Sequence, residues 1–234
     1  MRLQMESRVV GEVLVVRCRG RIVAVQEAQA LHDHVKKALP ETPDVVLQLA
    51  EIGFIDSSGL GTLVRLVTHA RSGGGDLKLC AVQEQILKTL RMTNLEKIFD
   101  VHEGEAGAIA ATYQRRPVRQ ANGLPPSRRV VCFDPSADMQ AYLRELLRHA
   151  GYNALTVSLL PDAQVLIRAT RPDLVILGPQ VLRGREMDPR GWVEKIAPQV
   201  PLIVLDEEFS GGDPGLAGQR LLESIRQLLP QNHA

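Results

Sequence analysis

The residues best suited to chemistry lie in the segment Ile52–Gly61, where two hydroxyls follow a carboxylate in the string Asp56-Ser57-Ser58-Gly59-Leu60-Gly61. An apolar strand precedes this segment and helical spacing follows it, so the hydroxyls are expected at a strand-to-helix turn. A hydroxyl at such a turn can act as a nucleophile, accept a phosphoryl group or cap the helix. Capping alone does not explain this segment, because a cap requires only one serine. It also does not explain the glycines, since each costs about 0.5–1 kcal/mol in a helix interior. We therefore interpret Gly59 and Gly61 as keeping the first turn flat for contact with another protein.

A hydrolase is the sharpest alternative, because a serine on a strand-to-helix turn is typical of a nucleophile elbow. That motif needs Gly-x-Ser-x-Gly, which neither Gly53 nor Gly59 completes. A triad also needs a histidine, and His69 is expected about three turns along the same helix, too far to take a proton from Ser57. The pair His32 and His34 should point to different helix faces, which argues against a metal site. We predict no catalytic residue, no metal, no cofactor and no enzymatic activity.

The elements that position this segment alternate strands and helices in the first half of the chain. The expected order is strand, strand, helix, strand, helix, strand, helix, strand, helix. The strands are expected at 12–19, 45–49, 77–81 and 98–101 after a first strand near the N-terminus, and the helix after Asp56 at 57–71. Gly73 to Gly75 should end that helix.

The 234 residues suit two domains of ordinary size. Residues 114–129 contain five arginines, three prolines and no acidic residue, which predicts an extended linker. The predicted organisation is a domain over 1–113, an Arg/Pro-rich linker over 114–128 and a second domain over 129–234. In the second half, strands expected at 130–133, 154–157, 174–177 and 202–205 alternate with helices such as 139–150, which predicts a mainly parallel sheet.

The string Asp56-Ser57-Ser58-Gly59-Leu60-Gly61, with 72–77, 90–95 and Ile98-Phe99, resembles the STAS domains of bacterial anti-sigma factor antagonists over about 8–112. The resemblance implies that Ser57, directly after the aspartate, is phosphorylated by a serine kinase that is also an anti-sigma factor. It also implies that the partner contacts Asp56, Ser57, Ser58, Gly59, Leu60 and Gly61. The family usually has Gly-x-Leu-Asp after its second strand, whereas this chain has Gly20-Arg21-Ile22-Val23 and so lacks the acidic residue.

The second half resembles receiver domains of response regulators over about 129–206, through Val130–Pro135, Leu143–Tyr152 and Arg171–Leu177. Receivers hold Mg²⁺ with an acidic pair and accept phosphate on an aspartate after the third strand. Only Asp134 of the pair remains, and Gly178 stands at the acceptor position. A helix and a strand of the usual receiver are also missing before the last helix, which is expected to begin near Leu216. The resemblance implies a truncated flavodoxin-like scaffold for dimerisation or docking; a chance cation site at Asp134 and residues 206–208 is the alternative.

The fold class expected from both halves is therefore α/β: a STAS-type sheet with covering helices linked to a truncated, receiver-like parallel α/β domain. The expected function is that of an anti-sigma factor antagonist, or a related partner-switching regulator, released from its kinase by phosphorylation at Ser57. The alternative is a non-phosphorylated STAS scaffold subunit of a membrane transporter or lipid-transport complex. With 3% aromatic residues and net charge +1, nucleic-acid binding is not expected.

The longest apolar runs are about strand length and the N-terminus has no signal-peptide pattern, so we expect a cytoplasmic protein without membrane insertion. Cys18, Cys80 and Cys132 are odd in number and lie in apolar, strand-like contexts. They are expected to be buried, reduced thiols rather than disulfide or zinc ligands. A homodimer remains an open alternative.

Overall fold

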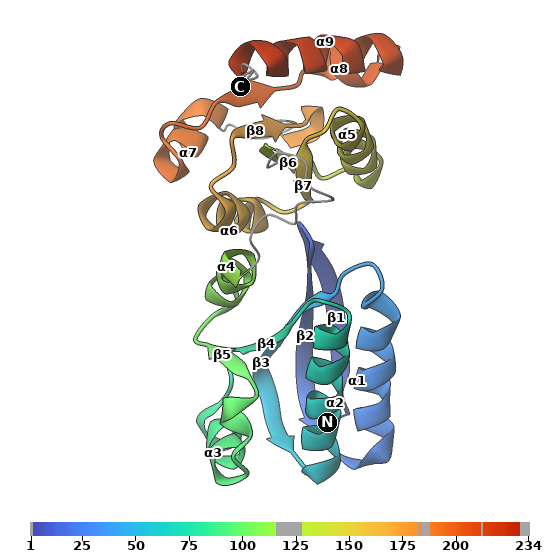
Figure 1. The fold of residues 1–234 in the computed structure, drawn as a ribbon, viewed down its shortest axis with the longest axis vertical. Helices are drawn as coiled ribbons and strands as arrows, with labels where there is room; N and C mark the ends of the chain where they lie inside the picture. Colours follow the sequence, from blue (N-terminus) through green and yellow to red (C-terminus); the bar gives the residue numbers. More distant parts are fainter. Residues whose placement is uncertain (1, 116–127, 182, 184–187, 212, 230–234) are drawn as a thin grey trace. The chain divides into compact units, whose positions relative to one another are not determined.

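The computed structural model describes residues 2–115, 128–181, 183, 188–211 and 213–229. The chain divides into two compact units, residues 1–115 and 116–234, each with its own sheet. Both units are α/β, as the alternating pattern predicts (Figure 1). The linker predicted over 114–128 lies mostly outside the described residues, but its first two residues belong to the helix that closes the first unit.

The first unit has a five-stranded sheet in the order β1-β2-β3-β4-β5, in which β1 and β2 are antiparallel and the other pairs are parallel. Its elements follow the predicted order, with one added 3-10 turn. They are β1 (Gln4–Val10), β2 (Val13–Ile22), α1 (Ala24–Ala38), β3 (Asp44–Ile55), α2 (Ser57–Ser72), β4 (Leu77–Cys80), α3 (Glu84–Met92), η1 (Leu95–Lys97), β5 (Asp100–His102) and α4 (Glu105–Arg115).

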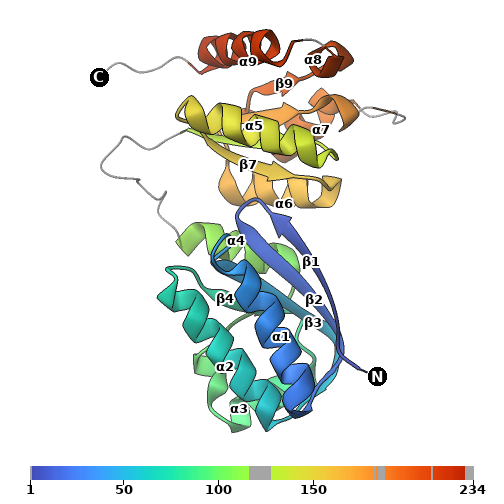
Figure 2. The same cartoon turned by 90° about the vertical axis from the view of Figure 1, so that its right-hand side faces the viewer.

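Helices α1, α2 and α3 share one hydrophobic core with the sheet, and α1 and α2 lie side by side (Figure 2). Leu31 of α1, Leu63 of α2 and Leu90 of α3 are fully buried in this core. Helix α4 packs against β3, β4 and β5. Its Tyr113 hydroxyl accepts a hydrogen bond from the Glu12 amide at 2.8 Å and donates to the Val10 carbonyl at 3.2 Å, which ties the helix to the β1–β2 turn.

The first unit also buries a lysine. Lys78 alternates with the core residues Leu77 and Leu79 on β4, so its side chain points to the opposite face of the sheet, where it is 2% exposed. Its ammonium group pairs with Asp100 of β5, and Asp76 lies 3.8 Å away. Burial raises the pKa of the Asp100 carboxyl, but the hydrogen bond from Lys78 and the charges of Lys78 and His102 outweigh it, so the pKa lies below its ordinary value.

The second unit has a four-stranded, wholly parallel sheet in the order β7-β6-β8-β9. The first strand of this unit along the chain, β6, therefore lies inside the sheet, between β7 and β8. The elements are β6 (Arg129–Phe133), α5 (Ala137–His149), β7 (Asn153–Val157), α6 (Leu160–Thr170), β8 (Leu174–Leu177), η2 (Pro179–Val181), α7 (Pro189–Ile196), β9 (Leu202–Val204), α8 (Glu207–Gly211) and α9 (Pro214–Leu228).

Helices α5 and α9 form one core with the central strands of the second unit through Leu143, Leu147, Leu221 and Ile225. Helices α6 and α7 contact one another, and Leu166 and Ile167 of α6 are buried outside that core. Among the described residues no fifth strand follows β9, and the short helix α8 stands between β9 and α9. The last helix begins two residues before the predicted start at Leu216.

All three cysteines are free and buried, as predicted. Burial raises the pKa of the Cys18, Cys80 and Cys132 thiols to about 12. A thiolate is the reactive form of cysteine, so these side chains behave as small apolar groups in the two cores. In the described part of the chain, no helix is both long and apolar enough to cross a membrane.

Candidate functional site

The predicted site lies where β3 ends and α2 begins, and Asp56 is the single residue between them. Asp56 is the N-cap of α2: its Oδ1 accepts a hydrogen bond from the Gly59 amide at 2.8 Å, and its carbonyl accepts one from the Leu60 amide at 2.9 Å. Its own amide donates to the Ile22 carbonyl at 3.2 Å and thereby fixes the turn to β2. The alternative that a serine caps this helix is therefore wrong, and both hydroxyls are left for another role.

Ser57 and Ser58 occupy the first turn of α2, with Ser57 exposed and Ser58 half-buried. Within the described residues neither hydroxyl has a hydrogen-bond partner. The backbone amides of a first helical turn lack intrahelical acceptors, and the helix dipole places partial positive charge there. Gly59 donates its amide to Asp56, so among the described residues of this first turn the amides of Ser57 and Ser58 are left to meet an oxygen from outside. Ser57 therefore presents an accessible hydroxyl where an anion is tolerated.

Gly59 does not lie on the contact surface, contrary to the prediction. It is buried. A Cβ on this residue would lie 2.5 Å from the Ile22 carbonyl oxygen, 2.7 Å from Ile55 Cγ2 and 2.9 Å from Ile22 Cγ2. The glycine is required because α2 crosses the end of β2 at this point. Leu60 is also mostly buried, at 8% exposure, and its side chain packs in the core of the first unit.

Gly61 differs from Gly59 because it is half-buried and a Cβ there meets no atom within 4 Å. Packing within the described residues therefore does not require a glycine at this position. The interpretation of small residues as a flat approach for a partner stays a prediction for Gly61, together with Ser57 and Ser58.

Val23 lies beside the site, where the resemblance leads one to expect an acid. Ile22 pairs with Ile55 in the parallel register of β2 and β3, so the next residues, Val23 and Asp56, are neighbours at the same edge. Val23 is the N-cap of α1 and makes no side-chain cap hydrogen bond. Because Val23 stands where the family usually has an aspartate, the neighbourhood of Ser57 has one negative charge fewer than in the family, and Val23 provides no side-chain cap for α1.

Two exposed apolar side chains flank the site and were not predicted. Phe54, two residues before Asp56, is 55% exposed, and Val25 in the first turn of α1 is 73% exposed. Simple alternation would place Phe54 on the same face as buried Ile52. However, β3 carries an extra residue at Gly53, because Gly20 pairs with Ile52 and Arg21 with Phe54. This β-bulge turns Phe54 outward, and strand periodicity alone gives no signal of it.

Asp134 and Asp206 of the second unit act as structural hydrogen-bond acceptors. Asp134 is fully buried; its Oδ1 accepts from the Ser136 amide at 2.7 Å and its Oδ2 from the Gln180 amide at 3.1 Å. Asp206 accepts from the Phe209 amide at 3.0 Å and so caps α8. Throughout the described residues, no three His, Cys, Asp or Glu side chains gather in a group that could hold a metal ion.

Gly178 stands at the position where a receiver has its acceptor aspartate, and the Asp134 carboxylate fills the space beside it. A Cβ on Gly178 would lie 2.1 Å from Asp134 Oδ2. Neither a carboxylate nor any other side chain therefore fits at this position while Asp134 keeps its present hydrogen bonds.

Residues 4–108 match the profile of the STAS domain family, which is just under half of the chain. This match identifies the N-terminal unit as a STAS domain. The chain is 28% identical over 116 residues to the anti-sigma F factor antagonist of Paenibacillus polymyxa, covering 47% of this chain and 94% of that protein. It is 25% identical over 87 residues to the anti-sigma-B factor antagonist of Bacillus subtilis (strain 168), covering 37% and 80%.

Solved structures similar to this chain include an anti-sigma factor antagonist from Mycobacterium paratuberculosis, at 19% identity and a TM-score of 0.41, covering 47% of this chain and 93% of that one. Another is the Bacillus cell fate determinant SpoIIAA in its phosphorylated form, at 19% identity and a TM-score of 0.39, covering 47% and 97%. Both matches span about half of this chain.

Proposed function

We propose that this protein is a cytoplasmic anti-sigma factor antagonist, or a closely related partner-switching regulator, that binds a serine-kinase anti-sigma factor and is released when that kinase phosphorylates Ser57. The observation that carries the proposal is the exposed Ser57 hydroxyl in the first turn of α2, left free because Asp56 caps the helix. The relatives named above are antagonists of anti-sigma factors, which supports a regulatory partner of that kind.

Phosphorylation would change the binding surface more than the fold. A phosphate adds about −1.5 to −2 charge at neutral pH. The free amides and the dipole at the start of α2 favour that charge, whereas the Asp56 carboxylate one residue earlier repels it. Because Ser57 is exposed, the phosphate does not need a cavity in the core. A partner that packs flat against this turn would instead have to bury a dianion, which is unfavourable without a cationic group opposite it.

The second candidate is a STAS scaffold subunit of a membrane transporter or lipid-transport complex that is not phosphorylated. Val23 favours it, because the acid that accompanies phosphorylation in the family is absent. Affinity purification of the intact chain from its native cell separates the two candidates. The first predicts an ATP-binding serine kinase of the GHKL type and a phosphate on Ser57 by mass spectrometry. The second predicts subunits of an ATP-driven transporter and an unmodified serine.

For the second unit we propose a degenerate receiver-like domain that docks or dimerises and accepts no phosphoryl group. Its strand order along the chain is second, first, third, fourth, which is the order of the flavodoxin-like fold without the fifth strand. Buried Asp134 and Gly178 support the absence of phosphoryl chemistry, because the carboxylate is already bound to two backbone amides. We also propose that the protein has no catalytic activity of its own.

A further inference from the structure

The sheet of the second unit ends at β9, which pairs with β8 on one side and with no described strand on the other. The Val175 amide donates to the Pro201 carbonyl and the Leu205 amide to the Leu177 carbonyl, so residues 201, 203 and 205 direct their backbone groups toward β8. In a parallel pair, alternate residues bond to opposite sides of the strand. Leu202 and Val204 therefore direct their amides and carbonyls to the open edge, and these four groups have no partner among the described residues.

The side chains of β9 are also less covered than those of its neighbour. All four residues of β8 are buried, whereas Leu202 and Ile203 are half-buried and Val204 is 37% exposed. A strand of a parallel sheet is normally covered on both faces. The incomplete cover shows that an element that would complete this edge is not supplied by the described part of the chain.

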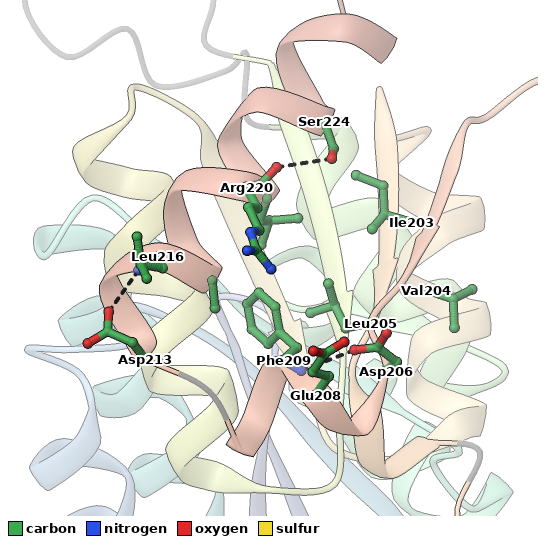
Figure 3. A pocket seen from close by; sticks show the side chains of 12 residues that line it. Ile203, Val204, Leu205, Asp206, Glu208, Phe209, Asp213, Leu216, Arg220 and Ser224 are labelled. Carbon is green, nitrogen blue, oxygen red and sulfur yellow. Dashed lines mark hydrogen bonds between the residues drawn. The ribbon is translucent and has the colours of Figure 1, made fainter.

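A cleft of about 450 Å³ borders this edge, between β9 on one side and helices α8 and α9 on the other (Figure 3). Three consecutive residues, Ile203, Val204 and Leu205, line it. Successive side chains of a strand point to opposite faces. Ile203 and Leu205 therefore share the face toward α9, where they join its core residues, and Val204 points to the other face (Figure 3). The cleft thus lies on the α9 side of β9, beside the open edge. Its far wall carries Leu216 of α9, which is 59% exposed, and Phe209 of α8.

The charges around the cleft are unbalanced. Asp206, Glu208 and Asp213 line it, against one guanidinium, that of Arg220. Asp206 and Glu208 follow β9 directly, so they mark the end of the cleft at the carboxyl end of the strand (Figure 3). An occupant with a positive group at that end would be favoured over one with a negative group.

We propose that the β9 edge binds an extended peptide segment of another protein by β-strand addition. The segment would bond to the outward amides and carbonyls of Leu202 and Val204, as in other sheet-edge complexes. Its alternate side chains would be apolar and would pack on Ile203, Leu205 and Leu216. A lysine or arginine at one end would lie beside Asp206 and Glu208.

A narrow segment fits this site better than a second copy of the chain. The cleft beside the edge is walled by α8 and α9, and a second copy would bring its own β9 flanked by the same two helices. A peptide needs only the width of one strand, about 4.8 Å from β9. A second copy would also place like charges together, because an antiparallel pairing about a two-fold axis repeats the surplus of acid on both sides.

The test selects random nine-residue peptides displayed on phage against the intact chain and three variants. Val204→Pro removes an outward amide that bonds to nothing in the sheet, a position where proline is tolerated on an edge strand. Val204→Thr, the matched control, keeps that amide and the β-branched shape. Glu208→Lys reverses a charge of the cleft at a side chain with no hydrogen bond to another described residue.

We expect the selected peptides to alternate apolar residues and to carry lysine or arginine at one end. They should bind the wild type and Val204→Thr within threefold of each other, and Val204→Pro at least tenfold more weakly. They should also bind Glu208→Lys several-fold more weakly. Amide hydrogen exchange on the wild type should slow at Leu202 and Val204 when the peptide is bound, which tests the site even if Val204→Pro fails to fold.

Three results would overturn the proposal. One is the absence of any peptide enriched over the blank support. Another is a bound peptide that protects neither the Leu202 nor the Val204 amide. The third is concentration-dependent dimerisation of the chain that protects these two amides without peptide, which would make a second copy the occupant. All three are independent of Ser57, so failure of the partner-switching proposal leaves this test unaffected.

Discussion

Replacing Gly59 with alanine should destabilise the first unit, because the new methyl group has no space. Its carbon would lie 2.5 Å from the Ile22 carbonyl oxygen, and that oxygen accepts the hydrogen bond from the Asp56 amide. Both the turn and the end of β2 would have to shift. Overpacking of this kind costs about 1–3 kcal/mol, and the gain in helix propensity from alanine returns at most about 1 kcal/mol. We expect a net loss of about 1–2 kcal/mol, or roughly 4–10 °C in the melting temperature of this unit.

Gly61→Ala is the matched control, since it adds the same methyl group two residues later, where nothing lies within 4 Å. It should leave stability unchanged or raise it by up to about 1 kcal/mol. Urea unfolding followed by far-ultraviolet circular dichroism measures both variants. Trp192, the sole tryptophan, belongs to the second unit, so its fluorescence should follow the same curve in all three proteins. Equal stability of the two variants would refute the assignment of Gly59 as a packing glycine.

Three further predictions concern the proposed switch and the buried charges. By calorimetry with the co-purified kinase, Ser57→Ala should bind like the wild type and Ser57→Asp at least tenfold more weakly; equal affinities would contradict the switch. Asp100→Asn should lower the free energy of unfolding by about 1–2 kcal/mol, because it leaves buried Lys78 with a weaker partner. Since the pKa of Asp100 is lowered in the folded state, its contribution is present above about pH 4 and is lost as pH falls further, so the wild type and Asp100→Asn should converge in acid urea titrations. Beryllofluoride with Mg²⁺ should leave the NMR spectrum around Asp134 and Gly178 unchanged, and specific Mg²⁺-dependent shifts there would show that the second unit accepts phosphate.

The element order of both units could be predicted from the sequence because each element carries a strong period. The apolar run Val13–Val16 and the helical spacing in 57–71 match β2 and α2 closely. The ends were harder to predict. β3 runs to Ile55, six residues past the predicted end, since it carries bulges where Gln48–Glu51 and Ile52–Phe54 each oppose one residue fewer on β2. A bulge interrupts the alternation on which the prediction relies.

At the site, the position of Ser57 could be predicted, but the role of its neighbours could not. The sequence shows that Gly59 and Gly61 are small, whereas only the crossing of α2 over Ile22 distinguishes a packing glycine from an open one. In the same way, periodicity does not show which of three polar residues caps a helix. Aspartate and serine have similar preferences for that position.

Both units have an aspartate bound to backbone amides at the end of a central strand, but the two sites differ in what they expose to solvent. In each, an aspartate after the strand accepts hydrogen bonds from backbone amides, Asp56 from Gly59 and Asp134 from Ser136 and Gln180. A glycine lies close to each turn, where a Cβ would clash with Ile22 at Gly59 and with Asp134 at Gly178. In the first unit the aspartate caps a helix whose next hydroxyl, that of Ser57, faces solvent. In the second unit the Asp134 carboxylate is fully buried and bound to backbone amides, and the position of a receiver's acceptor aspartate holds Gly178. In the proposed function, phosphorylation is therefore confined to Ser57 of the first unit, and the second unit would contribute to regulation through what its surface binds.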